Sequence, residues 1–288
     1  MCLKNKYQNE GYCVVKNAVP SALLTRLDNM AKALENKALA LSSELDLEQA
    51  AVDSLEVPTT VFRINHVYRT EAALVNQLLS SPQVYKAIVS LGGGDIIPLG
   101  VDINFKSSHV AAVVPWHQDS IHDGTAPYFA MGVYLDDADE NDGCLRYLPG
   151  SHKQKQDVHQ LASQHGWNIP QHQQVPVTAG DVLFHDVMTL HGSTSKVSPG
   201  SRRTIYVEFR PAKEILATGS QSENWVNLRK RWMALLHAKA IRMNDSDMKD
   251  DSHVKELPSE FYQDLYANRE KPTPSNWAFP PVKREDYP

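Results

Sequence analysis

The chain has 288 residues, of which 42% are hydrophobic and 22% charged, and its formal net charge is −5. Its 29 lysine and arginine residues are scattered and form no stripe, which argues against a nucleic acid or an anionic membrane as a partner. The three cysteines are odd in number and lack CxxC spacing, so a disulfide framework and a thiolate zinc site are disfavoured. No stretch is apolar for the ~20 residues of a membrane span, and no signal-peptide run opens the chain. These features predict a cytoplasmic protein that acts on a small molecule.

The N-terminal part predicts a strand and then a helix. Residues 11–19 (GYCVVKNAV) alternate enough for a short strand, and apolar residues recur at helical spacing from Leu23 to Leu34. The Ala/Leu-rich continuation to about Ala51 fits either a second helix or a loop, and its periodicity does not decide between them. Farther along, residues 61–68 (VFRINHVY) predict a strand.

Two helices are expected between residues 71 and 90, separated where Ser81-Pro82 interrupts the helical pattern. From Ile96 to Phe209 the sequence then changes to short β-branched or aromatic runs separated by turn residues. Many short strands of this kind predict a β-sandwich or a barrel.

The polar interval 152–174 lies within this β region and is expected to form a loop over one end of the barrel. An amphipathic helix is predicted at 225–241, and the Pro-rich tail at 272–288 has no core of its own.

The stretch PWHQDS at 115–120 places an imidazole and a carboxylate two positions apart. In an extended strand His117 and Asp119 point to the same side. Two ligands rarely hold a transition metal, and His191, which follows the apolar run GDVLFHDVMTL, supplies a third. Two histidines and one carboxylate occupy one face of a non-haem iron(II) ion and leave its other positions open. The three residues therefore predict an iron site.

Four sequence blocks resemble the phytanoyl-CoA dioxygenase-like branch of the Fe(II)/2-oxoglutarate-dependent oxygenases. They are WHQD at 116–119, GCLRYLPGSHK at 143–153, AGDVLFH at 179–185 and HGSTSKVSPGSRR at 191–203. The blocks occur in the family's order and at its spacing, and a looser similarity runs from about Gly11 to Arg210.

This resemblance implies a mainly β fold with flanking helices, built on a double-stranded β-helix (jelly-roll) core. We expect one catalytic domain over residues 1–288, with the β core at about 96–210, an N-terminal cover at 11–95, and a C-terminal helix and tail at 211–288.

The resemblance also implies the roles of individual residues. His117, Asp119 and His191 would ligate Fe(II), and Arg202, eleven residues after His191, would bind the far carboxylate of 2-oxoglutarate. A planar guanidinium suits that task because it donates two parallel hydrogen bonds to a carboxylate. The adjacent Arg203 would face the opposite way in a strand, and it remains the alternative anchor.

Three further side chains are expected near the cosubstrate: Ser193 as a hydroxyl donor to the same carboxylate, and Arg63 and Asn104 beside it. His185 lies six residues before His191 and is expected to support the site or the core, with a role as a ligand as the alternative.

The expected cofactors are Fe(II), 2-oxoglutarate and O2, with ascorbate as a possible reductant. The expected reaction is hydroxylation of an unactivated C–H bond with release of succinate and CO2. Desaturation, epoxidation or cyclisation with the same cofactors are alternatives, and a non-catalytic, cupin-like metal-binding protein is the alternative from another class. Polar residues in the regions 52–65, 120–127 and 152–174 favour a compact polar substrate, such as an amino acid, osmolyte, phosphonate or natural-product intermediate, over a long acyl-CoA.

Overall fold

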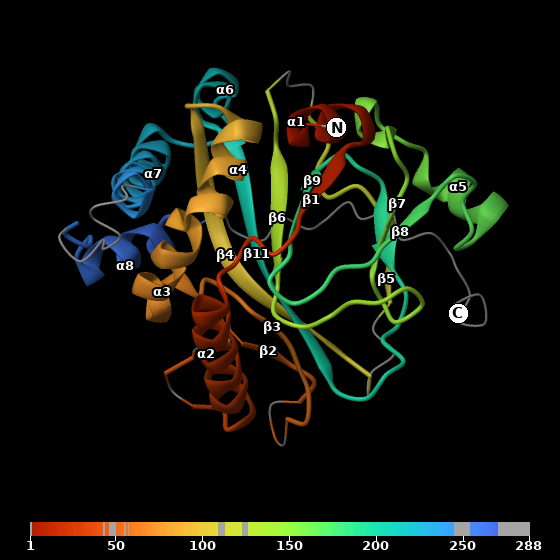
Figure 1. Ribbon diagram of the computed structural model, residues 1–288, viewed down its shortest axis with the longest axis horizontal. Coiled ribbons are helices and arrows are strands. Elements are labelled where there is room, and N and C mark those ends of the chain that lie inside the picture. Colours follow the sequence, from red (N-terminus) through yellow and green to blue (C-terminus); the bar gives the residue numbers. More distant parts are fainter. Residues whose placement is uncertain are drawn as a thin grey trace.

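Two antiparallel sheets face each other in the computed structural model of the chain, which describes residues 2–42, 44–45, 50–54, 56, 58–108, 113–122, 126–244 and 254–269 (Figure 1). In these residues the larger sheet consists of β1 (Tyr12–Val15), β9 (Val182–Asp186), β6 (Phe129–Tyr134), β11 (Ser201–Pro211), β4 (Ile96–Ser107), β3 (Val61–Ile64) and β2 (Ala50–Val52), in that order. The smaller sheet consists of β5 (Val114–His117), β10 (His191–Ser193), β7 (Leu145–Tyr147) and β8 (Gln173–Val175), in that order. The predicted mainly β architecture with flanking helices is confirmed.

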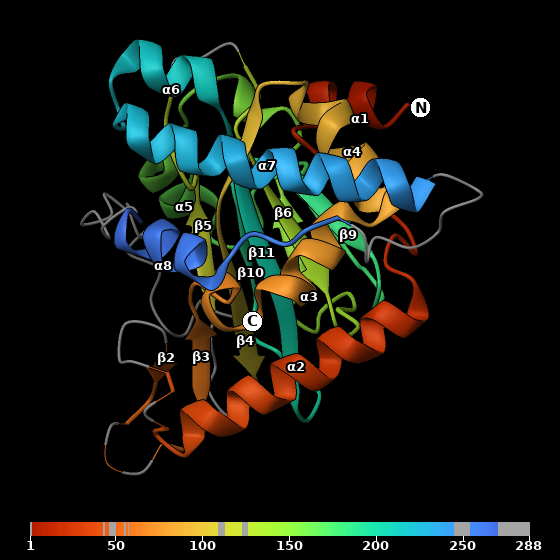
Figure 2. The same cartoon turned by 90° about the vertical axis from the view of Figure 1, so that its left-hand side faces the viewer.

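Helices cover the outer faces of both sheets. They are α1 (Leu3–Glu10), α2 (Ser21–Leu39), α3 (Tyr68–Ser80), α4 (Pro82–Gly92), α5 (Val158–His165), α6 (Ala212–Thr218), α7 (Glu223–Asn244) and α8 (Ser259–Ala267). Figure 2 shows α2, α3, α7 and α8 lying across the larger sheet, whereas α5 lies on the side of the smaller sheet in Figure 1. None of the helices in the described part of the chain is long and apolar enough to cross a membrane.

The larger sheet has one apolar and one polar face, because side chains alternate along each strand. Val182, Val133, Ile205, Ile103 and Ile64 lie side by side across five strands and are buried in the core under the helices. The neighbouring residues point toward the smaller sheet, where one row of paired residues is Tyr134, Thr204, Asn104 and Arg63. Polar groups therefore line part of the space between the sheets, and an apolar cluster that includes Leu183, Leu145 and Val175 fills another part.

Three predictions of local structure need correction. The interval 152–174 is not a loop, because it contains α5, whose N-cap Asp157 accepts a hydrogen bond from the backbone N–H of Gln160. Its apolar residues Trp167 and Ile169 pack on Trp116 of the smaller sheet.

The strand predicted at 61–68 ends at Ile64, since His66 has a positive φ of 54° and α3 begins at Tyr68. Residues 50–52 form β2, so the continuation to Ala51 ends in a strand rather than in a helix or loop. Helices α6 and α8 were not predicted. The Pro-rich tail lies outside the described residues.

Arg203 faces the helical side of the larger sheet. Its guanidinium donates hydrogen bonds of 2.8 and 2.6 Å to Asp136 and lies 2.8 Å from Asp28 on α2. These carboxylates raise the pKa of Arg203. The contacts join α2 to the strand that also contains Arg202.

We predict that Arg203→Met lowers the free energy of unfolding by about 3 kcal/mol, because it leaves two carboxylates without their shared cation. Urea unfolding measures this change. Lys32→Met is the matched control, since Lys32 pairs with the same Asp28 but is exposed, and removing it costs about 0.5 kcal/mol or less. An unchanged stability together with lost 2-oxoglutarate binding would instead make Arg203 the cosubstrate anchor.

Candidate active site

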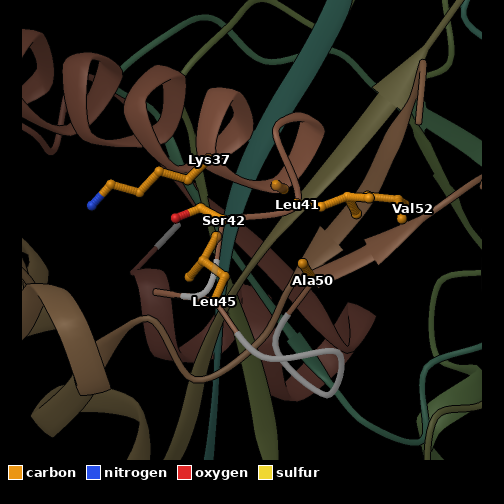
Figure 3. Close-up of a pocket in the computed structure, with 7 residues that line it drawn as sticks. Lys37, Leu41, Ser42, Leu45, Ala50 and Val52 are labelled. Atoms are coloured by element: carbon orange, nitrogen blue, oxygen red, sulfur yellow. The ribbon is translucent and has the colours of Figure 1, made fainter. Parts of the chain in front are cut away.

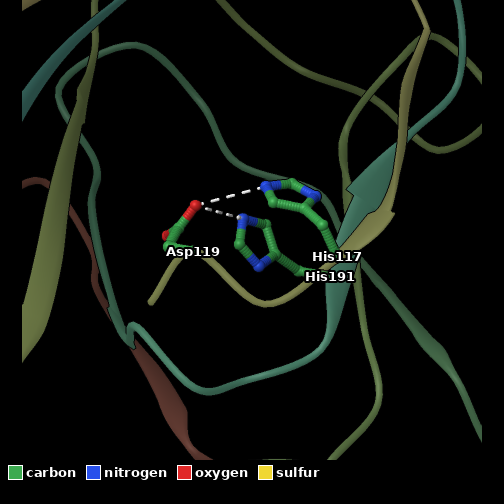
Figure 4. A group of neighbouring side chains, drawn as sticks. All are labelled: His117, Asp119 and His191. Carbon is green, nitrogen blue, oxygen red and sulfur yellow. Dashed lines mark hydrogen bonds and ion pairs between the residues drawn. The ribbon is translucent and has the colours of Figure 1, made fainter. Parts of the chain in front are cut away.

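Two histidines and an aspartate meet at the edge of the smaller sheet (Figure 4). His191 begins β10 and pairs directly with His117 at the end of β5, while Asp119 lies two residues beyond that strand. The Nε2 atoms of His117 and His191 lie 3.2 and 3.8 Å from Oδ1 of Asp119. One ligand atom from each of the three residues lies within 4.8 Å of the other two. The structure thus brings the three predicted iron ligands together.

Hydrogen bonds to the backbone set the tautomers of both histidines. Nδ1 of His117 lies 2.7 Å from the carbonyl oxygen of Pro115, and Nδ1 of His191 lies 2.8 Å from that of Thr189. A carbonyl oxygen only accepts, so each Nδ1 carries the proton and donates it. The Nε2 atom of each ring then faces Asp119 and is the atom available to a metal ion. Three acceptors that converge in this way fit a divalent cation, and His–carboxylate donors suit iron.

The charge states agree with metal binding. Burial and the neighbouring His117 lower the pKa of His191 to about 3, so its ring is neutral at physiological pH. Burial alone would raise the pKa of Asp119, but His191, His117 and His185 together hold it well below its usual range. His191 and Asp119 can therefore bind a cation without first losing a proton.

His185 supports the carboxylate from the opposite sheet. Its Nε2 lies 3.0 Å from Oδ2 of Asp119, and its Nδ1 lies 3.1 Å from the hydroxyl of Tyr147. Oδ2 is the oxygen that does not face His117, so His185 fixes the orientation of the carboxylate. Tyr147 also stacks on the ring of His191 with centroids 5.6 Å apart. Tyr147 was not among the predicted site residues, although its alternation with Arg146 would have placed it on the inner face of β7.

Arg202 and Arg203 point to opposite faces of β11. Arg202 is buried on the inner face, where its Nη1 donates a hydrogen bond to the carbonyl oxygen of Gly143 and its guanidinium lies 5.8 Å from the Tyr134 ring centroid. Its Nε is buried and has no hydrogen-bond partner. Arg203 is bound to carboxylates on the helical side. Only Arg202 therefore faces the space that contains His117 and His191.

The other expected cosubstrate residues lie on the same inner faces. Ser193 is buried on β10, two residues after His191. Arg63 and Asn104 are paired across β3 and β4, and Oδ1 of Asn104 is buried with no hydrogen-bond partner. Arg63 forms an ion pair with Asp102, and about half of its side chain is exposed. This pair places Arg63 at the rim.

Tyr206 connects the iron ligands with Arg202. Burial raises its pKa, Arg202 lowers it and Asp119 raises it, so its hydroxyl lies within electrostatic reach of both residues. Tyr206 therefore senses the charges of both Asp119 and Arg202.

Comparison with known proteins decides the family. The family model described as phytanoyl-CoA dioxygenase (PhyH) matches residues 7–204. The chain belongs to the phytanoyl-CoA dioxygenase family. The enzyme class predicted from the four sequence blocks, an Fe(II)- and 2-oxoglutarate-dependent dioxygenase, is thereby confirmed.

Relatives within this class differ in substrate. A probable alpha-ketoglutarate-dependent hypophosphite dioxygenase of Stutzerimonas stutzeri is 25% identical over 224 residues, which cover 73% of this chain and 78% of the relative. The crystal structure of AviO1 from Streptomyces viridochromogenes Tue57 is similar with a TM-score of 0.60 and 25% identity, covering 72% of this chain and 92% of AviO1.

A crystal structure of EctD from S. alaskensis with 2-oxoglutarate and 5-hydroxyectoine has a TM-score of 0.59 at 19% identity, covering 73% of this chain and 75% of EctD. It shows similarity of fold alone, and with it the predicted jelly-roll core is confirmed.

Two other features of this PhyH-family chain lie away from the triad. Arg146 is buried on β7 next to the inward-facing Tyr147, so alternation directs it to the outer face of the smaller sheet.

Figure 3 shows a hollow between the end of α2 and β2, lined by Lys37, Ala38, Leu41, Ser42, Leu45, Ala50 and Val52. Its lining is mostly apolar and contains none of the expected site residues.

We predict that His185→Phe weakens metal binding by about 10- to 100-fold without abolishing it, because Asp119 loses the donor that orients it. Calorimetric titration with Fe(II) under anaerobic conditions measures the affinity. His165→Phe, at an exposed position on α5, is the control and should bind metal normally. If His185→Phe removed binding as completely as His191→Ala, His185 would be a ligand rather than a support.

Proposed function

We propose that the chain is a hydroxylase in which His117, Asp119 and His191 hold Fe(II) and Arg202 holds the far carboxylate of 2-oxoglutarate. The observation behind this proposal is that two sites lie between the same two sheets. Three converging acceptors fit a divalent cation, and a buried guanidinium with an unpartnered Nε fits a carboxylate. A protein that only binds a metal has no need of the second site.

Each protein group has a defined task. Iron, when bound, supplies the reaction of dioxygen with 2-oxoglutarate that yields succinate, CO2 and an oxidised substrate. His117 and His191 present Nε2 lone pairs, and His185 holds Asp119 so that one oxygen remains directed at them. Arg202 and Ser193 orient the cosubstrate from the inner faces of the two sheets.

The substrate that we propose is a compact polar metabolite. The ion pairs Glu208–Arg210 and Arg63–Asp102 lie on the inner face of the larger sheet near its rim, where a long acyl chain would meet charges. Both ring nitrogens of His122 are buried with no hydrogen-bond partner, and this ring stacks on Tyr128 at 4.1 Å. The relatives with hypophosphite or 5-hydroxyectoine in their names also point to small polar compounds.

The remaining expectations belong to this proposal as well. We propose one catalytic domain over residues 1–288, a small molecule rather than a nucleic acid as partner, a cytoplasmic location, and ascorbate as a reductant that keeps iron ferrous.

The first test is succinate formation from 2-oxoglutarate with Fe(II) and ascorbate. We expect slow turnover without a second substrate, and faster turnover with members of a panel of amino acids, osmolytes and phosphonates. Stimulation by a long acyl-CoA and by none of the compact compounds would contradict the substrate class. Absence of both turnover and 2-oxoglutarate binding would contradict the cosubstrate assignment itself.

Substitutions separate the two sites. His117→Ala or Asp119→Ala should abolish metal binding and activity, because two donors do not retain iron. Arg202→Met should leave metal affinity unchanged and raise the 2-oxoglutarate concentration for half-maximal turnover by about 100-fold, since a buried charge pair is lost. Arg203→Met is the matched control and should need the same 2-oxoglutarate concentration for half-maximal turnover as the wild type. If Arg202→Met reached half-maximal turnover at the wild-type 2-oxoglutarate concentration, Arg202 would not be the cosubstrate anchor.

A further inference from the structure

A second buried cation lies beside Arg202. Lys106 on β4 pairs directly with Arg202 on β11, so both side chains extend from the inner face of the larger sheet. Both residues are buried, with 7% and 5% of their surface exposed. Neighbouring strands lie only about 4.8 Å apart, so the two positive charges share one small region.

Both cations reach the smaller sheet and its connecting segments. Lys106 Nζ donates a 2.6 Å hydrogen bond to the carbonyl oxygen of Thr194, the residue directly after Ser193. Arg202 donates to the carbonyl oxygen of Gly143, and a Cβ added at Gly143 would lie 3.1 Å from Cδ of Lys106. The ammonium, the guanidinium and the segment that contains Ser193 thus lie close together between the two sheets.

The electrostatics of this end favour an anion. Burial and the charge of Arg202 lower the pKa of Lys106 to about 7. Burial raises the pKa of Cys144, which also lies near this end, so this thiol is protonated at neutral pH and supplies no negative charge. Two adjacent buried cations repel each other, and a carboxylate placed between them relieves the repulsion while it accepts hydrogen bonds from both.

We propose that Lys106 is a second cationic anchor for the far carboxylate of 2-oxoglutarate and makes the site select 2-oxo dicarboxylates over 2-oxo monocarboxylates. This inference rests on the proposed function, in which Arg202 is the only cation assigned to that carboxylate. Lys106 would position the cosubstrate, and this role does not involve the metal ligands.

The test is binding of two 2-oxo acids to the protein loaded with Zn(II), which has no redox chemistry. Isothermal titration compares 2-oxoglutarate with 2-oxopentanoate, in which a methyl group replaces the far carboxylate. We expect Lys106→Met to weaken the binding of 2-oxoglutarate by about 10-fold or more, which is the scale of a lost charge-assisted hydrogen bond. The affinity for 2-oxopentanoate should stay unchanged. Lys106→Arg should restore most of the affinity. Lys86→Met, at an exposed position on α4, is the control and should bind both acids as the wild type does.

The number of protons taken up when 2-oxoglutarate binds is a second readout, and replacing a purely structural lysine would not change it. Titrations in two buffers of different ionisation enthalpy should show that the wild type takes up part of a proton with 2-oxoglutarate near pH 7.5. Lys106→Met and Lys106→Arg should not show this uptake, because neither has a group at this position that gains a proton.

If Lys106→Met weakened the binding of both acids equally, Lys106 would have a structural role and the proposal would be overturned. Undiminished 2-oxoglutarate affinity in that variant would overturn it as well, and would leave the Arg202 anchor intact. Failure of the wild type to bind 2-oxoglutarate at all would remove the proposed function and this inference together.

Discussion

The pairing of His191 with His117 across β10 and β5 is the constraint on which the site depends. It places two imidazoles side by side, with ring centroids 4.2 Å apart, from segments more than 70 residues apart in the chain. Backbone carbonyls then fix each ring so that Nε2 faces Asp119. A register shift of one residue would turn either ring to the other face of the sheet and remove the metal site.

The alternation of side chains along β11 gives its two neighbouring arginines different tasks. Arg203 joins α2 to the larger sheet through two carboxylates, whereas Arg202 lies beside Lys106 on the inner face of that sheet. Farther along β11, Ile205, Val207 and Phe209 belong to the core under the helices. One strand therefore contributes both to the stability of the fold and to the position of the cosubstrate.

The sequence predicted the metal triad, the strand-rich region and the face of Arg202 because each depends on local spacing or on a motif. The role of α5 was missed because its apolar positions are spread among polar residues, and only contact with Trp116 buries them. Lys106 and Tyr147 were missed for a different reason. Their importance depends on which residue lies opposite them on another strand, and strand register is not visible in a single sequence.

The most direct test of this account is an anaerobic crystal structure with Fe(II) and 2-oxoglutarate bound. We predict iron within about 2.2 Å of Nε2 of His117, Nε2 of His191 and one oxygen of Asp119, with His185 bound to the other oxygen and not to the metal. The far carboxylate of 2-oxoglutarate should contact Arg202. Iron bound elsewhere, or a cosubstrate whose far carboxylate lies away from Arg202, would contradict the account.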